Sequence, residues 1–133
     1  MNLDQQLVDA AIAEIDRRFP NEIGIAAALY TLEGDILIGV RFNLKYGPGR
    51  LCAETEPILY AYRHNKTVTA SVCLYRDPLD GRYLVLSPCG MCQERLIHWG
   101  KDVEVAVPAA ADPARWQAKT LHELVPHYWQ DVL

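Results

Sequence analysis

The chain has 133 residues, of which 50% are hydrophobic and 23% are charged, and its formal net charge at pH 7 is -4. These values are typical of one globular domain, residues 1–133, that is long enough to bury a core. Lys and Arg are scattered, without the basic stripe and interleaved aromatics of a protein that holds a polynucleotide, so nucleic acid is excluded as an expected partner.

The N-terminus and the cysteines indicate the cellular compartment. Residues 1–4 begin an acidic amphipathic pattern rather than a signal peptide, and no apolar run approaches the length of a membrane span. The cysteines are Cys52, Cys73, Cys89 and Cys92. In a chain of this size without a secretion signal, a C-x-x-C pair is more often a metal or redox site than part of a disulfide framework. We therefore predict a cytoplasmic protein that has no membrane partner.

The first forty residues predict a helix followed by a β-hairpin. Apolar residues recur at helical spacing across residues 3–19, and acidic residues take the other faces. Residues 23–30 are apolar on both faces, which predicts a central strand that is covered on both sides. After a turn, residues 35–40 return as its hairpin partner.

The middle of the chain predicts a loop, a helix and two extended runs. Residues 41–51 contain Gly47-Pro48-Gly49 and show no periodicity, so they form a loop. A helix follows over residues 53–64. Residues 68–75 alternate as a strand, and residues 82–87 are extended after a turn.

The last third predicts a helix, a strand, a loop and a short helix. Pro88 opens a helix over residues 89–99, because proline is well tolerated at a helix start. Residues 103–107 are predicted as a strand and residues 108–113 as a loop. Residues 121–128 are predicted as a last helical segment that is interrupted or ends around Pro126. Strands that alternate with helices after a hairpin indicate an α/β domain with a mixed sheet, whose active site lies where the cysteine-bearing helices begin.

Three cysteines at the starts of two predicted helices indicate a metal centre. Cys89 and Cys92 are three residues apart directly behind a proline, and Cys52 precedes the earlier helix. Free N–H groups and the helix dipole favour the thiolate, which is the form of cysteine that binds zinc. Three protein ligands leave one position of a tetrahedral zinc site open, as in hydrolytic zinc enzymes.

Glu54 is the predicted acid and base of this centre. It lies two residues after Cys52, which places its carboxylate near the metal without making it a ligand. Water that zinc activates needs a nearby group to take and return protons. We predict that this water attacks a ring carbon bearing an amino group, and that Glu54 protonates the ring nitrogen and the departing amine.

On these residues the chain resembles the cytidine deaminase family, in the compact three-cysteine branch that includes cytidine deaminases proper and blasticidin S deaminases. The resemblance is carried by Cys52-Ala53-Glu54 and Ser87-Pro88-Cys89-Gly90-Met91-Cys92, and it spans most of the chain. It implies a three-layer α-β-α fold, zinc on Cys52, Cys89 and Cys92, and Glu54 as the proton shuttle.

The resemblance also implies contacts with a small substrate and with neighbouring subunits. Backbone groups of Ala53 and Ser87 contact the amide or amino edge of the base. Family members are usually homotetramers in which an aromatic residue near the C-terminus reaches a neighbouring site, and Trp129 holds the matching position. The implied activity is deamination of a cytidine-like nucleoside in nucleoside metabolism, such as pyrimidine salvage, by a homo-oligomer.

The loop before Cys52 departs from the family pattern. Nucleoside-specific members usually carry Asn and Glu there to hold the sugar hydroxyls, and those positions are Arg41 and Asn43 in this chain. Tyr46, in the same loop, is a candidate contact for a base. Thr55 stands where many members have an arginine that balances the thiolate charge.

Two alternatives stay open. The first keeps the chemistry and changes the substrate to a blasticidin S-type aminonucleoside or a free base, because the sugar-loop positions differ. The second is a non-catalytic protein that zinc stabilises for binding or assembly. A closed structural zinc site needs a fourth ligand, and the chain's histidines lack ligand-like spacing from a cysteine. Cys73 lies within a predicted strand and is interpreted as a core residue.

Overall fold

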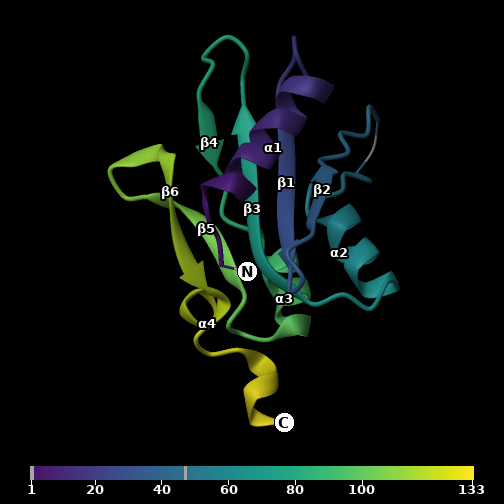
Figure 1. The fold of residues 1–133 in the computed structure, drawn as a ribbon, viewed down its shortest axis with the longest axis vertical. Coiled ribbons are helices and arrows are strands. Elements are labelled where there is room, and N and C mark those ends of the chain that lie inside the picture. The colour runs from purple at the N-terminus through teal and green to yellow at the C-terminus, as the bar shows by residue number, and fades with distance from the viewer. Residues whose placement is uncertain (1, 47) are drawn as a thin grey trace.

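The computed structural model describes residues 2–46 and 48–133 and arranges them as a mixed sheet flanked by helices (Figure 1). The elements follow one another in this order: α1 (Gln5–Arg18), β1 (Gly24–Thr31), β2 (Ile36–Val40), α2 (Thr55–Arg63), β3 (Val68–Arg76), β4 (Tyr83–Val85), α3 (Gly90–Leu96), the 3-10 helix η1 (Ile97–Trp99), β5 (Glu104–Ala109), β6 (Asp112–Thr120), α4 (Leu121–Leu124) and the 3-10 helix η2 (Trp129–Val132). Met1, in the predicted acidic N-terminus, and Gly47, in the predicted loop, lie outside the described residues.

The sheet combines antiparallel and parallel pairs, which confirms the predicted mixed sheet. Its strand order is β2-β1-β3-β5-β6, and β4 pairs with β3. β3 and β5 run parallel, whereas the β1–β2, β1–β3, β3–β4 and β5–β6 pairs are antiparallel. Every residue of β1 is buried, as the apolar character of both its faces predicts.

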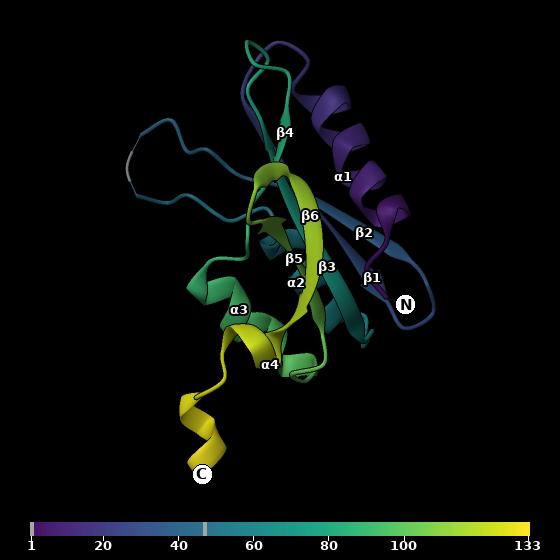
Figure 2. The same cartoon turned by 90° about the vertical axis from the view of Figure 1, so that its left-hand side faces the viewer.

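Helices cover both faces of this sheet and produce the expected three layers. Because successive side chains of a strand point to opposite faces, alternate residues of β1 face α1 and the residues between them face α2 and α3. Ala26 and Ala28 pack with α1, whereas Ala27 packs on the opposite side with Ala61 of α2 and Leu96 of α3. In Figure 2 α1 lies on one side of the sheet and α3 on the other. The small alanines of β1 let both helical layers approach closely.

The expectation of a loop over residues 108–113 is wrong. Pro108 and Ala109 belong to the end of β5, while Asp112 and Pro113 begin β6, which continues to Thr120. β6 is rich in residues with weak strand propensity and alternates in burial at an edge of the sheet. Its pairing with β5 is therefore a tertiary effect that local propensity did not indicate.

The helix predicted over residues 89–99 is shorter than expected, whereas the last helical segment ends near Pro126 as predicted. α3 ends at Leu96 and is followed by a 3-10 turn, which Gly100 closes with φ 104°. α4 has four residues, begins with a capping box between Thr120 and Glu123, and ends before Pro126, because a residue that precedes proline disfavours helix. Among residues 2–46 and 48–133, no helix is both long enough and apolar enough to cross a lipid bilayer.

Candidate metal centre

Three cysteines that are far apart in the sequence meet where α2 and α3 begin. The Sγ atoms of Cys52, Cys89 and Cys92 all lie within 4.8 Å of one another, and those of Cys52 and Cys89 are 3.4 Å apart. Tetrahedral zinc with Zn–S bonds of about 2.3 Å holds its sulfurs roughly 3.8 Å apart. The spacing of these three thiols therefore fits a zinc ion, and the ligand assignment remains a prediction.

Helix-terminal hydrogen bonds position the thiols. Cys89 is the N-cap of α3, and its carbonyl accepts from the Gln93 N–H at 2.8 Å. The Gln93 side chain also donates to the Pro88 carbonyl at 2.8 Å, which holds the turn that leads into the helix. On the other side, the Cys52 carbonyl accepts from the Thr55 N–H at 3.0 Å. Cys89 is thus held at the start of α3, and Cys52 in the turn that precedes α2.

The thiols differ in their ease of ionisation. Burial, and then repulsion from Glu54 and from the other thiols, raises the pKa of Cys92. Burial, followed by the neighbouring Cys89 thiol, also raises the pKa of Cys52. Burial opposes ionisation of Cys89 too, but the N–H groups of Cys92 and Met91 and the adjacent thiols outweigh it, and the Cys89 pKa is lowered. Three thiolates at this spacing require a cation, because metal binding and thiol deprotonation are linked.

Glu54 presents a buried carboxylate beside the thiols. Only 3% of the residue is exposed, and although it is the N-cap of α2 its side chain makes no capping hydrogen bond. Burial raises its pKa, while hydrogen bonding to its own backbone N–H, the Cys73 and Cys92 thiols and the charge of Arg95 act in the opposite direction. A carboxyl group whose pKa rises towards neutrality can both take and return a proton.

Arg95 supplies positive charge near the position where the family pattern has arginine. Its Nη1 donates to the Thr55 Oγ1 at 3.5 Å, so α3 brings a guanidinium to the residue that follows Glu54. The charge of Arg95 also acts on the Glu54 carboxyl. The departure at Thr55 is thus accompanied by a cation from another helix.

A cavity of about 290 Å³ opens beside the cysteines and Glu54. Of the predicted substrate contacts, Arg41, Ala53 and Ser87 line it. Its lining residues come from β1, the loop before Cys52, β3 and the segment before α3, and they are Ile25, Arg41, Arg50, Leu51, Cys52, Ala53, Glu54, Cys73, Leu86, Ser87 and Cys89. The two sequence motifs therefore share one hollow.

The other three predicted substrate contacts do not line this cavity. Asn43 and Tyr46 are exposed in the loop, and the Tyr46 ring lies near the Lys45 ammonium. Trp129 lies on η2, where its Nε1 donates to Glu94 Oε1 at 2.8 Å. This terminal segment extends away from the sheet in both views (Figures 1 and 2). The expected role of Trp129 in a neighbouring subunit stays a prediction.

Residues that the motifs did not indicate complete the cavity. Cys73 is buried, as expected of a core residue, but its thiol also interacts with the Glu54 carboxylate. Arg50 lies two residues before Cys52, and side chains two apart in an extended segment share a face. That spacing was the available signal for Arg50. Cys73 carried no comparable signal, because only the pairing of β3 brings it to the site.

Gly39 of β2 sets how closely the strand approaches the site. A Cβ at this position would lie 2.3 Å from the Ala53 carbonyl oxygen and 2.5 Å from Pro57 Cδ. A real Cβ cannot approach backbone oxygen so closely, so only glycine allows the segment that bears Glu54 to pack on β2.

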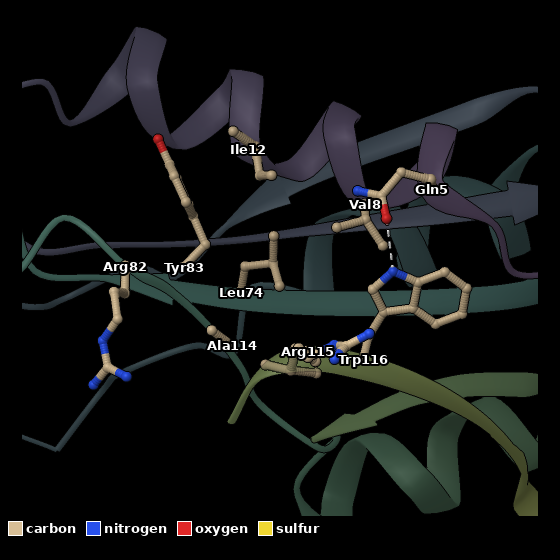
Figure 3. A pocket seen from close by; sticks show the side chains of 10 residues that line it. Gln5, Val8, Ile12, Leu74, Arg82, Tyr83, Ala114, Arg115 and Trp116 are labelled. Atoms are coloured by element: carbon tan, nitrogen blue, oxygen red, sulfur yellow. Dashed lines mark hydrogen bonds between the residues drawn. The ribbon is translucent and has the colours of Figure 1, made fainter. Parts of the chain in front are cut away.

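A larger cavity, of about 530 Å³, lies on the other side of the sheet. Figure 3 shows its lining residues between α1, β4 and β6, with Trp116 Nε1 donating to Gln5 Oε1 at 2.9 Å. Arg82 and Arg115 are at its border, and neither cysteine nor an acidic residue is among the described residues that line it. It lacks the groups that a hydrolytic centre needs.

Comparisons with known proteins agree on the kind of protein that this chain resembles. No family model matches the chain. The cytidine deaminase from Bacillus anthracis is 40% identical, with a TM-score of 0.89 over 98% of this chain and 92% of that one. Blasticidin-S deaminase of Bacillus cereus is 29% identical over 128 residues, which are 92% of this chain and 89% of the relative. The cytidine deaminase from Mycobacterium leprae, 21% identical, shares the fold with a TM-score of 0.70 over 95% of this chain and 100% of that one.

Proposed function

The chain belongs to the cytidine deaminase family, and from this membership we propose that it hydrolytically deaminates a small aminopyrimidine nucleoside and releases ammonia. The observation that carries the proposal is a cluster of three thiols within 4.8 Å of one another, two of which, Cys52 and Cys89, line the same cavity as the buried Glu54 carboxylate. Burial of a carboxylate costs free energy, and a purely structural cysteine site gives no reason to bury Glu54, which is only 3% exposed, beside the thiols.

The proposed metal ligands are Cys52, Cys89 and Cys92, with zinc as the ion. Their spacing fits tetrahedral zinc, and backbone N–H groups at the start of α3 favour the thiolate of Cys89. When bound, zinc supplies an activated water molecule for attack on the ring carbon that bears the amino group.

Glu54 is the proposed proton carrier. Its carboxylate takes the two protons of the attacking water one after the other, and delivers one to the ring nitrogen and the other to the departing amine. The water oxygen remains on the ring carbon as a carbonyl, the exocyclic C–N bond breaks, and ammonia leaves. A pKa that burial raises suits this exchange, because the carboxyl must hold each proton briefly and then release it.

The walls of the cavity are proposed to hold and orient the heterocycle. Ile25 and Leu86 provide apolar surface, and backbone groups of Ala53 and Ser87 provide polar contacts for the edge that carries the amino group.

A blasticidin S-type aminonucleoside or a free base is the second candidate substrate. The relative from Bacillus cereus supports this candidate, and so does Arg41, which lines the cavity where a sugar-binding residue is expected. A non-catalytic role is less well supported, because it leaves the buried Glu54 without a function.

Self-association in the cytoplasm completes the proposal. Exposed apolar side chains of α2 and the adjacent loop line one groove, namely Phe42, Leu51, Leu59 and Tyr60, and patches of this kind mark interaction sites. A dimer or tetramer that covers them is the proposed assembly, and Trp129, which is exposed on η2, is the proposed contact with a neighbouring subunit.

The proposed reaction is tested by ammonia release. The zinc-loaded protein is incubated with cytidine, deoxycytidine, cytosine and blasticidin S, beside a Glu54→Gln variant that keeps the shape of the side chain. We expect ammonia from one or more substrates with the parent protein only. Release of ammonia from none of them, with zinc retained, would favour the non-catalytic alternative.

A further inference from the structure

Two guanidinium groups border the cavity that holds Glu54 and the cysteines. Arg41 and Arg50 both line it, on the side formed by the loop before Cys52. Within the part of the chain that the structure describes, neither side chain forms an ion pair or a hydrogen bond. Arginines that border a largely apolar hollow without an acidic partner are available to bind a ligand.

Backbone pairing in the loop explains why the two arginines reach the same cavity. The Phe42 N–H donates to the Leu51 carbonyl at 3.0 Å, and the Leu51 N–H donates to the Phe42 carbonyl at 3.2 Å. In an antiparallel pair, the residues on either side of this bridge point to the opposite face. Arg41 and Arg50 therefore turn towards the face of Cys52, while Phe42 lines a separate groove beside α2.

We infer that the substrate carries an anionic group, a phosphate or a carboxylate, which Arg41 and Arg50 bind while the aminated ring lies at Glu54. This inference rests on the proposed function and narrows its substrate class. Guanidinium groups match phosphate and carboxylate oxygens through paired N–H donors, and two of them in one cavity make a neutral sugar a poor match. The position where the family pattern uses a residue for sugar hydroxyls would then serve a charged group.

An alternative use of the same charges leads to a different result. If Arg41 and Arg50 only balance the thiolates, then their removal lowers turnover of neutral and anionic substrates by the same factor. If they bind an anionic group, their removal lowers the preference for the anionic substrate. The ratio of the two kcat/KM values therefore separates the two explanations.

The test compares three substrates that share one base. Cytidine is neutral, cytidine 5′-monophosphate carries a phosphate, and cytidine 5′-carboxylic acid carries a carboxylate. We expect kcat/KM for at least one anionic substrate to exceed that for cytidine by roughly tenfold or more at low salt, and the advantage to shrink as NaCl is raised. The phosphate and carboxylate arms show which anion the site prefers.

Variants connect the preference to the two arginines. Arg41→Gln and Arg50→Gln should each bring the anionic-to-neutral ratio of kcat/KM most of the way back towards one, since each loses charged hydrogen bonds to the anionic group. Arg50→Lys, which retains the positive charge, should keep part of the preference for the anionic substrate. Lys45→Gln is the matched control, because Lys45 is in the same loop but does not line the cavity, and its ratio should stay within about twofold of the parent protein.

Binding of the reaction products tests the inference without turnover. Calorimetry on the zinc-loaded protein compares uridine with uridine 5′-monophosphate and the uridine 5′-carboxylic acid. Tighter binding of an anionic product, lost in Arg41→Gln or Arg50→Gln, supports the anion site even if no substrate releases ammonia, in which case the proposed reaction alone fails. An anionic-to-neutral ratio of one or below, or an equal loss for all substrates in the variants, overturns the inference.

Discussion

The two sides of the sheet carry hollows of opposite character. The cavity beside α2 and α3 measures about 290 Å³ and contains thiols, a buried carboxylate and two arginines, whereas the cavity beside α1 measures about 530 Å³ and lacks described thiols and acids. A reactive site is recognised by the polar groups that converge in a cavity, and not by the volume of the cavity. Substitutions on the side of α2 and α3 should therefore alter zinc content and kcat. Substitutions on the side of α1 should alter the free energy of unfolding.

The largest effect is expected from Cys89→Ala. Removal of one of three thiols leaves too few ligands for the ion, so zinc content should fall from near one per chain towards zero and activity should be lost. Metal analysis after desalting measures this. Cys73→Ala is the control, since Cys73 lies outside the three-thiol cluster and the variant should keep its zinc. Full zinc in Cys89→Ala would contradict the ligand assignment.

Glu54→Gln should separate turnover from metal binding. The amide keeps the size of the buried side chain but cannot carry protons, so kcat should fall by roughly 10²–10⁴-fold while zinc content is unchanged. Ammonia release and metal analysis on the same preparation are the measurements. Near-parent kcat in this variant would remove Glu54 from the mechanism.

Gly39→Ala tests how close packing of β2 supports the site. The added methyl group collides with the Ala53 carbonyl, so we expect a loss of about 1–3 kcal/mol in unfolding free energy and a decrease in kcat. Denaturant unfolding and steady-state kinetics measure the two effects. Gly90→Ala is a matched control because its methyl group meets no atom within 4 Å. Equal behaviour of the two variants would show that the contact at Gly39 is unimportant.

Trp116→Phe tests the opposite side of the sheet. The variant removes the hydrogen bond from Trp116 Nε1 to Gln5 Oε1, and the expected cost is about 0.5–1.5 kcal/mol of unfolding free energy, with kcat and zinc content unchanged. Denaturant unfolding provides the measurement. A large loss of activity without a loss of stability would mean that the two sides are coupled, and the contrast between them would fail.

A pH dependence is expected on the α1 side, outside the physiological range. Burial, and then the hydrogen bond to Asp4, raises the pKa of Tyr30 from 10.0 to about 12. The folded protein therefore retains a proton that the unfolded chain loses between these values, and stability should fall as pH rises through that window. Tyr30→Phe should show a shallower fall in denaturant unfolding across the same pH range. The same dependence of unfolding free energy on pH in Tyr30→Phe and in the parent protein would show that Tyr30 is not its source.

The residue pattern predicted most of the layered fold but not its edge. A continuous apolar run identified β1, because a strand that is covered on both faces has apolar residues throughout. Apolar residues at helical spacing identified α1, because one face of this helix is buried. The sequence of β6 shows neither of these apolar patterns. Its alternation is shallow, its residues have weak strand propensity, and its stability comes from pairing with β5.

Short-range motifs are sufficient to name the metal ligands and the acid as candidates, because helix starts favour thiolates and Glu54 is two residues from Cys52. Which side chains share the cavity depends instead on contacts between distant segments. The bridge between Phe42 and Leu51 turns Arg41 and Arg50 to one face, and β3 brings Cys73 to Glu54. Backbone pairing across long separations has no local signal. The class of reaction can therefore be predicted from two motifs, but the shape and charge of the substrate cavity depend on the folded chain.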